Sequence, residues 1–384
     1  MDFDITDEQE QVRTEVRRFA ENEIADVAAE YDEKEKFPHE IVDKAAEMGL
    51  TGPYIPIEYG GAGYDTLTTA LIVEELFAVD PGIALSISAT SFGTEAIMEF
   101  GTDDQKERFL EPVALGEKIS GAAISEPNAG SDVSSVSTSA DLDGDEWVID
   151  GNKMWITNGT VGDFFVVLVE TDPEAEGRYN GFSQIVVESD REGFTADKIT
   201  GKLGIRASDT AELVFDGVRV PEENLIGTRG MGFLQLMQFF DMTRTMVAAQ
   251  GLGISKGATD RALEYAQERE QFGREISEFQ AIQHKLADMR IRTEAARWLT
   301  YYSAWSVDHR EEDLTMLASM AKEFASRVAT DVADEAVQIY GGSGYVNDFD
   351  VERFYRDAKI TQIYEGTTEI QKNIVAREML GKGY

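Results

Sequence analysis

The sequence contains no cysteine, and it has only three histidines and eight prolines among 384 residues. The absence of cysteine excludes disulfides, thiolate nucleophiles and thiolate metal ligands. The histidines, His39, His284 and His309, are isolated from one another, so we expect no histidine-rich metal site. No apolar stretch approaches the ~20 residues of a membrane span, and Met1–Asp4 does not begin a basic and then apolar leader. We therefore expect a soluble protein of the cytoplasm.

Basic residues are the other scarce class. There are 35 lysines and arginines against 73 aspartates and glutamates, which gives a formal net charge of -38. A surface of this sign repels phosphate backbones, so nucleic acid is not an expected partner. The acids recur along the whole chain, from Asp7-Glu8 through Asp103-Asp104 to Glu311-Glu312-Asp313. Counterions screen such self-repulsion, and we infer a high-salt cytoplasm, as in a halophile.

Several nucleotide and hydrolase motifs are also missing. The chain has neither a P-loop nor a nucleophile elbow. Gly251, Gly253 and Gly257 superficially resemble a dinucleotide loop, but no strand precedes them and the last glycine comes one residue late. We interpret these glycines as sites of close helix packing.

Three regions that differ in the spacing of their apolar residues follow one another along the chain. With 42% hydrophobic residues the chain can bury a large core. We predict an α+β protein with an N-terminal α-helical domain (1–118), a middle β-sheet or barrel domain (119–226) and a C-terminal four-helix bundle (227–384). A capping box of Thr6 and Gln9 starts the first helix. This order of helices, strands and helices argues against a doubly wound nucleotide fold.

Within these regions the pattern of apolar residues predicts individual elements. The expected N-terminal helices cover 41–48, 66–77, 88–100 and 103–115. Strands are expected at 147–149, 164–169, 182–187 and 211–215, with tight turns at 143–145 and 150–152. Long helices are expected at 233–268, 278–309 and 314–341, and a terminal helix from Glu369.

One stretch near the C-terminus could carry chemistry. Glu365 is followed by Gly366 and by a helix start at which Thr368 and Gln371 fit a capping box. A carboxylate that projects from such a tight turn could serve as a general base. Taken alone, Glu365 is better explained as a solvated acid of a first helical turn, so the other motifs must decide.

Two motifs of the β domain could hold a flat cofactor or a phosphate. Residues 124–133 offer hydroxyls and accessible backbone amides. Residues 153–159 place Trp155 and Thr157 two positions apart on one strand face, where an indole could pack on a ring and a hydroxyl could bond to its edge. The alternatives are an ordinary loop and a core tryptophan.

Three further motifs complete a pattern: Arg269-Glu270-Gln271-Phe272-Gly273 followed by Gln280, residues 338–345, and residues 353–357 leading into Tyr364-Glu365-Gly366-Thr367. Over essentially the whole chain these motifs resemble the acyl-CoA dehydrogenase family, most closely its short-chain and butyryl-CoA members. The resemblance implies FAD-dependent oxidation of a short or medium straight-chain acyl-CoA to trans-2-enoyl-CoA. Glu365 would remove the α-proton and flavin N5 would take the β-hydride. It also implies a homotetramer and an electron-transfer flavoprotein as the acceptor.

The resemblance also assigns residues to FAD, some of them from a neighbouring subunit. These are Ala122, Ile124, Ser125, Gly130, Ser131, Trp155, Ile156, Thr157, Arg269, Phe272, Gln280, Gln338, Gly341, Gly342, Thr367, Thr368 and Glu369. The substrate-binding residues that it implies are Ser131, Asp241, Arg244, Glu365 and Gly366. A minority of the family carries its glutamate at the position of Thr243, so Glu365 is the only base that matches here.

The sequence departs from the family at a few positions, and two other functions stay open. Ser125 stands where threonine is common, Asn128 where glycine is frequent, and Thr368 where serine is frequent. One alternative is a flavin monooxygenase or oxidase of the same fold, and the other is a non-catalytic scaffold paralogue. Such monooxygenases and oxidases usually lack the glutamate, and retention of Glu365, Thr157 and Arg269 argues against a scaffold. Acyl-chain length and branching stay undecided.

Overall fold

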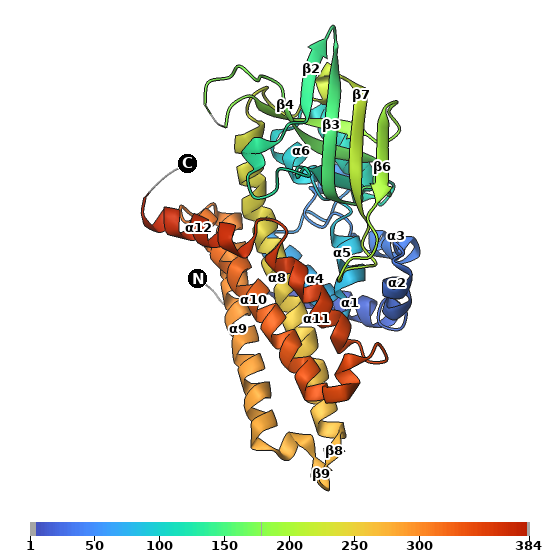
Figure 1. Cartoon of the computed structure of the whole chain (residues 1–384), viewed down its shortest axis with the longest axis vertical. Coiled ribbons are helices and arrows are strands. Elements are labelled where there is room, and N and C mark those ends of the chain that lie inside the picture. The colour runs from blue at the N-terminus through green and yellow to red at the C-terminus, as the bar shows by residue number, and fades with distance from the viewer. Residues whose placement is uncertain (1–4, 178, 382–384) are drawn as a thin grey trace.

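The computed structural model describes residues 5–177 and 179–381, so Met1–Asp4, on which the leader expectation rests, lie outside it. A β domain occupies one end of an elongated molecule, and long helices run from it to the other end (Figure 1). Among the described helices, none is long and apolar enough to cross a membrane. The order of helical, β and helical regions confirms the predicted fold class.

The N-terminal region consists of helices, and the capping box of Thr6 and Gln9 starts the first of them as predicted. The helices are α1 (Asp7–Glu23), α2 (Ala28–Lys34), α3 (His39–Glu47), α4 (Thr66–Val79), α5 (Pro81–Ser88), α6 (Thr94–Phe100) and α7 (Asp103–Ala114). The single helix expected at 88–100 is wrong, because the chain breaks between α5 and α6. Gly93 adopts a φ of 97°, and the carbonyl of Thr90 accepts the Ser120 N–H at 2.7 Å. This tertiary pairing competes successfully with helix formation.

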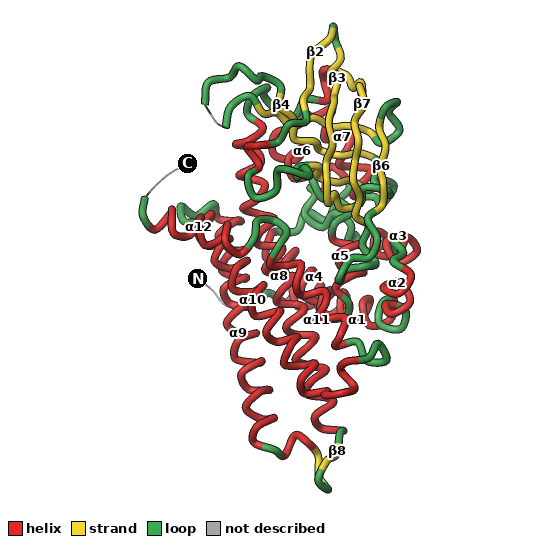
Figure 2. The backbone as a smooth tube through the Cα atoms, viewed as in Figure 1, coloured by secondary structure: helices red, strands yellow, loops and turns green. Residues whose placement is uncertain are grey.

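The middle region is one curled sheet (Figure 2). Its strands are β1 (Ser120–Ala123), β2 (Ser139–Asp143), β3 (Glu146–Thr157), β4 (Phe164–Glu170), β5 (Phe182–Glu188), β6 (Phe194–Lys198) and β7 (Thr210–Pro221). The order is β1-β4-β2-β3-β7-β6, and β5 pairs with β4. The turn predicted at 143–145 is confirmed as a hairpin, with Asp143 opposite Glu146. The turn predicted at 150–152 is wrong, because β3 continues through a bulge at Gly151, where a Cβ would lie 2.7 Å from the Thr138 Cα.

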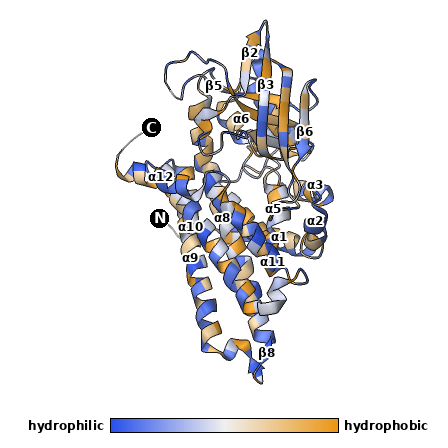
Figure 3. Cartoon of the chain, in the orientation of Figure 1, coloured by the Kyte–Doolittle hydropathy of each residue, from blue (hydrophilic) through white to orange (hydrophobic). Residues whose placement is uncertain are grey.

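Strand β4 joins the β domain to the N-terminal helices. Phe165 and Val167 face the interior of the sheet, whereas Phe164 and Val166 pack beneath α6 and α7. The ring centroids of Phe164 and Phe109 of α7 are 5.0 Å apart. Because both faces are covered, β4 is apolar from Phe164 to Val169. Strand β3, by contrast, mixes hydrophilic and hydrophobic residues along its length (Figure 3).

The C-terminal region contains three long helices and two shorter ones. They are α8 (Gly232–Glu268), α9 (Gln280–His309), α10 (Leu314–Tyr340), α11 (Val351–Ala358) and α12 (Thr368–Met379). Helix α4 packs along α8, where a Cβ on Gly253 would lie 2.5 Å from the Glu74 carbonyl oxygen and one on Gly257 would lie 2.2 Å from that of Ala78. The interpretation of these glycines as helix-packing sites is confirmed.

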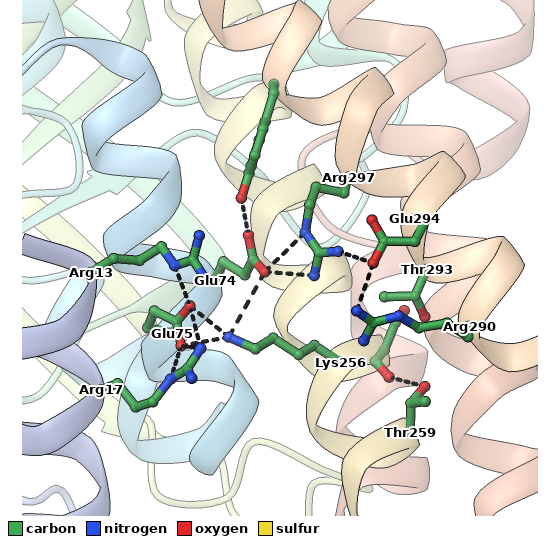
Figure 4. Close-up of polar contacts among 12 residues, drawn as sticks. Arg13, Arg17, Glu74, Glu75, Lys256, Thr259, Arg290, Thr293, Glu294 and Arg297 are labelled. Atoms are coloured by element: carbon green, nitrogen blue, oxygen red, sulfur yellow. Dashed lines mark hydrogen bonds and ion pairs between the residues drawn. The ribbon is translucent and has the colours of Figure 1, made fainter. Parts of the chain in front are cut away.

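A network of charges around the buried Glu74 and Glu75 joins α1, α4, α8 and α9 (Figure 4). The side chain of Glu75 is 1% exposed and lies 3.2 Å from Arg13, 2.8 Å from Arg17 and 2.5 Å from Lys256. The neighbouring Glu74 pairs with Arg297 at 3.0 Å. Removing one member of such a network leaves buried charges without their partner, so we expect it to matter for stability.

Candidate active site

Glu365 lies in the turn between the short 3-10 helix Lys359–Gln362 and α12. Its φ is 51° and that of Gly366 is 85°, so two successive residues are left-handed. Positive φ is costly for a residue other than glycine and, when the surroundings impose it, often marks a functional position. The side chain is half-buried, and one carboxylate oxygen accepts a hydrogen bond of 2.8 Å from Thr243 Oγ1 on α8.

Two side chains donate hydrogen bonds to the backbone carbonyl oxygens of this turn. Gln371 Nε2 donates to the carbonyl oxygens of Glu365 at 2.9 Å and of Gly366 at 3.0 Å. Lys322 Nζ donates to the same Gly366 oxygen at 2.6 Å. The predicted capping box of Thr368 and Gln371 is therefore wrong: Thr367 is the N-cap, and the Gln371 amide serves the turn instead. Within the described residues the backbone N–H of Glu365 has no hydrogen-bond partner, so it is available as a donor.

The surroundings of Glu365 set its acidity. Burial raises the pKa of its carboxyl, and the Thr243 hydroxyl, Lys322 and Arg244 each oppose that effect, leaving the pKa above its ordinary value. A second buried acid, Glu95 on α6, has its pKa raised by burial to about 7, and the charge of Glu365 adds to that rise. A carboxylate with a raised pKa is a stronger base, so Glu365 is suited to remove a weakly acidic proton.

The predicted substrate residues of α8 lie beside this turn. Arg244 is buried and pairs with Asp241 Oδ1 at 2.9 Å, while Asp241 Oδ2 accepts a hydrogen bond of 2.8 Å from Thr315. Thr243, between them in the sequence, contacts Glu365 directly. The structure therefore brings Asp241, Arg244 and Glu365 together as the sequence predicts.

The two β-domain motifs are joined by a buried ion pair. Glu126 accepts hydrogen bonds from the backbone and side chains of Ser137 and Thr138, at 2.7 to 2.9 Å. Lys153 donates to Glu126 at 3.0 Å and to the carbonyl oxygen of Ile124 at 3.1 Å. Burial opposes ionisation of Glu126, but Lys153 and the hydrogen-bond donors hold its pKa at about 2. This pair fixes the start of the 124–133 loop against β3.

The predicted cofactor residues in and after β1 and in β3 differ in how far their side chains are exposed. Trp155 is 62% exposed with a φ of 65°, which excludes the alternative of a core tryptophan. Thr157 is half-buried, whereas the side chain of Ile156 packs into the sheet interior, so Ile156 could reach a ligand only through its backbone. Ala122 is buried, Ile124 and Ser125 are half-buried, and Gly130 and Ser131 are exposed.

The remaining predicted FAD residues fall into two places. Thr367, Thr368 and Glu369 directly follow the Glu365–Gly366 turn, at the start of α12. The others lie at the opposite end of the molecule, where the β8–β9 hairpin (Glu270–Gln271 and Arg274–Glu275) joins α8 to α9 (Figure 1). There Tyr265 and Tyr340 stack at 4.0 Å, which places the end of α10 beside that of α8. This distal group consists of Arg269, Phe272, Gln280, Gln338, Gly341 and Gly342. Within one chain it is not brought to Glu365.

Sequence patterns do not predict three residues that contact Glu365 or its turn. They mark Thr243 only for not being an acid and Gln371 only as a capping residue, and they do not mark Lys322. A signal for Lys322 exists, because it shares one helical face with Ala318, Ala325 and Ala329, which are all buried. A lysine at a core position of an apolar stripe indicates that its ammonium has a buried hydrogen-bond partner.

Comparison with known proteins gives the same assignment along the entire chain. Three family profiles match: the acyl-CoA dehydrogenase N-terminal domain over residues 6–117, the middle domain over 121–218 and the C-terminal domain over 230–380. The chain is 47% identical over 377 residues to the short-chain specific acyl-CoA dehydrogenase of Clostridium acetobutylicum, covering 98% of this chain and 99% of that protein.

Two solved structures are similar throughout. Butyryl-CoA dehydrogenase from Megasphaera elsdenii superposes with a TM-score of 0.95 at 41% identity, covering 99% of this chain and 100% of that one. A chain from a structure described as the electron transferring flavoprotein of Acidaminococcus fermentans gives a TM-score of 0.96 at 42% identity, with coverages of 99% and 100%. The chain therefore belongs to the acyl-CoA dehydrogenase family of flavoprotein oxidoreductases.

Proposed function

We propose that the protein catalyses FAD-dependent α,β-dehydrogenation of an acyl-CoA thioester to the trans-2-enoyl-CoA, with Glu365 as the base. The observation that carries the proposal is the half-buried carboxylate of Glu365, held in a left-handed turn with a raised pKa and a hydrogen bond from Thr243. A thioester acidifies its α-carbon only weakly, so the reaction needs a strong base at a fixed position. Bound FAD would supply the acceptor for the β-hydride.

The backbone of the same turn can assist the base. When a proton leaves the α-carbon, negative charge develops on the thioester oxygen, and preorganised donors stabilise it. The Glu365 N–H has no partner among the described residues. Gln371 donates to the carbonyl oxygens of Glu365 and Gly366, and Lys322 donates to that of Gly366. We infer that this N–H donates to the thioester oxygen.

Several residues fit FAD on grounds that are independent of resemblance. The exposed indole of Trp155 offers a flat surface next to the 124–133 loop. Gly130 and Gly342 have neither a positive φ nor any atom within 4 Å of an added Cβ, so the packing of this chain does not explain their being glycine. Close approach of a cofactor explains it. We propose that Trp155, Thr157 and the 122–131 segment bind the flavin ring region.

The proposed substrate is a short or medium straight-chain thioester. We propose that its acyl chain lies against the mostly apolar surface between α6, α8 and strands β1 and β4, where the structure has a small hollow. The lining includes Gly93, Ala96, Ala122, Ile124, Leu236 and Phe239. We propose that Ser131, Asp241, Arg244 and Gly366 complete the binding site for the thioester. Similarity to short-chain and butyryl-CoA enzymes supports this range.

We further propose that the enzyme works as a homotetramer and passes electrons to an electron-transfer flavoprotein. The distal group, with Phe272 94% exposed, lies far from Glu365 of its own chain, so it could complete FAD binding only in a neighbouring subunit. Likeness to a chain from a structure described as an electron transferring flavoprotein supports the acceptor.

Product analysis tests the proposed reaction. The purified protein is incubated with butyryl-CoA and an artificial electron acceptor, and the thioester is identified by mass and by comparison with authentic trans-2-enoyl-CoA. Loss of two hydrogens is the expected result, and rates with longer and branched thioesters rank the chain lengths. A hydroxylated or unchanged thioester would replace the proposal with the monooxygenase or scaffold function.

The charge of the chain leads to a prediction about salt. We propose a cytoplasmic enzyme of a halophile, because a net charge of -38 is tolerable only when counterions screen it. Melting temperature and oligomer size should both rise from dilute buffer to molar KCl, as measured by differential scanning fluorimetry and light scattering. A melting temperature that does not change with KCl would contradict this proposal.

A further inference from the structure

Lys322 is a buried cation whose charge the proposed mechanism does not use. Its side chain is 0% exposed on α10, and its ammonium donates to the carbonyl oxygen of Gly366. Lys153 and Lys256 are also buried, but each contacts a glutamate, at 3.0 and 2.5 Å. Lys322 forms no ion pair within 4.0 Å among the described residues. Burial of an ammonium is unfavourable when no anion contacts it, so the position of Lys322 needs a physical explanation.

We propose that Lys322 is a positioning residue for Glu365: its ammonium anchors the Gly366 carbonyl behind the turn and supplies the positive charge that keeps the base ionised in a closed site. The inference rests on the proposed role of Glu365 as the base. Hydrogen bonding to Gly366 fixes the direction in which the preceding residue projects, and the charge acts on the carboxylate through a region of low dielectric.

The charges around Lys322 support this role. Arg244 of α8, Glu369 of α12, Glu323 of its own helix and Glu365 all act on it. Burial lowers the pKa of Lys322 to about 8, and Glu365 is the strongest of the charges that raise it. The ammonium is therefore charged below about pH 8, and there it lowers the pKa of Glu365 against the effect of burial. Apolar substrate would bury the turn further, which increases the need for a fixed cation.

Two substitutions separate the charge from the hydrogen bond. Lys322→Gln keeps an N–H donor for Gly366 without the charge, and Lys322→Met removes both. The rate of flavin reduction by butyryl-CoA is followed against pH. The affinity for acetoacetyl-CoA, which has no β-hydride to give, is followed by calorimetry over the same range. In both variants the acid limb of the rate profile and that of the affinity profile should move to higher pH. Below the midpoint of that limb, the rate of flavin reduction should be about tenfold lower than in the wild type. Above it, Lys322→Gln should approach the wild type.

The matched control is Lys256→Met, which removes a buried ammonium that contacts Glu75 and not the turn. It should lower the melting temperature and leave the acid limb unchanged. An equal loss of the flavin-reduction rate at every pH in Lys322→Met, with the wild-type rate in Lys322→Gln, would overturn the electrostatic role. If Lys322→Met does not fold, the profile of Lys322→Gln decides. If wild-type flavin is not reduced by any acyl-CoA, the proposed function fails instead.

Discussion

Glu365→Gln should bind FAD and acyl-CoA as the wild type does, yet reduce its flavin at least ~10³-fold more slowly. The amide has almost the same shape and can still accept the hydrogen bond from Thr243, but it cannot take up the α-proton. The turn keeps its anchors, because Gln371 and Lys322 bind backbone carbonyls and not the side chain. Single-turnover reduction followed at the flavin absorbance band measures the effect.

Glu146→Gln provides the matched control for this substitution. Glu146 is exposed on β3 and pairs with Arg219, far from the turn in the sequence and in the fold. It should reduce flavin at the wild-type rate. Retained turnover in Glu365→Gln would show that another group removes the proton, and loss of bound FAD would show that Glu365 serves binding instead.

Glu75→Gln should lower the free energy of unfolding by about 3 kcal/mol, because it leaves the buried Lys256 and the partly exposed Arg13 and Arg17 without the anion that they share. The three cations come from two helices, α1 and α8, so the loss loosens the packing of both against α4. Urea unfolding followed by circular dichroism measures the difference. Asp143→Asn removes an exposed partner of Arg219 and should leave the urea midpoint unchanged.

The effect of Glu75→Gln should depend on pH in one direction. Burial by itself would raise the pKa of Glu75, but ion pairing with Arg17 and Lys256 holds it below its ordinary value. A carboxyl with a lowered pKa contributes stability that is complete above the pKa of the unfolded chain, ~4.3 for glutamate, and is lost as pH falls. The difference from wild type should therefore be complete near neutral pH and shrink below about pH 4. A difference that grows in acid would contradict this account.

The fold was predictable wherever local pattern and tertiary packing agree. Runs of strand-forming residues at 164–169 and 182–187 mark β4 and β5, and the glycines of α8 indicate helix contact because no strand precedes them. Prediction failed where a distant segment decided the backbone. The pairing of Thr90 with Ser120 breaks the helix expected at 88–100, and pairing with β7 holds Asp150-Gly151-Asn152 in a strand despite its turn chemistry.

The candidate site likewise divides into features that local sequence pattern indicates and features that only tertiary packing decides. Glu365 could be identified as the candidate base because several motifs agree with it, and Arg244 with its partner Asp241 lies close enough to act on its charge. The apolar stripe around Lys322 indicates that this lysine is buried, but the sequence does not reveal which backbone carbonyl lies opposite it. The sequence gives no indication that the adjacent acids Glu74 and Glu75 are buried, because their burial follows from the packing of four helices.

The central claim is that this chain oxidises an acyl-CoA at its bound flavin, and an anaerobic absorbance titration with butyryl-CoA in molar KCl tests it most directly. The account predicts that the flavin band bleaches rapidly with substrate in the wild type and fails to do so in Glu365→Gln. A flavin that stays oxidised with every acyl-CoA offered, or a purified protein without flavin, would contradict it.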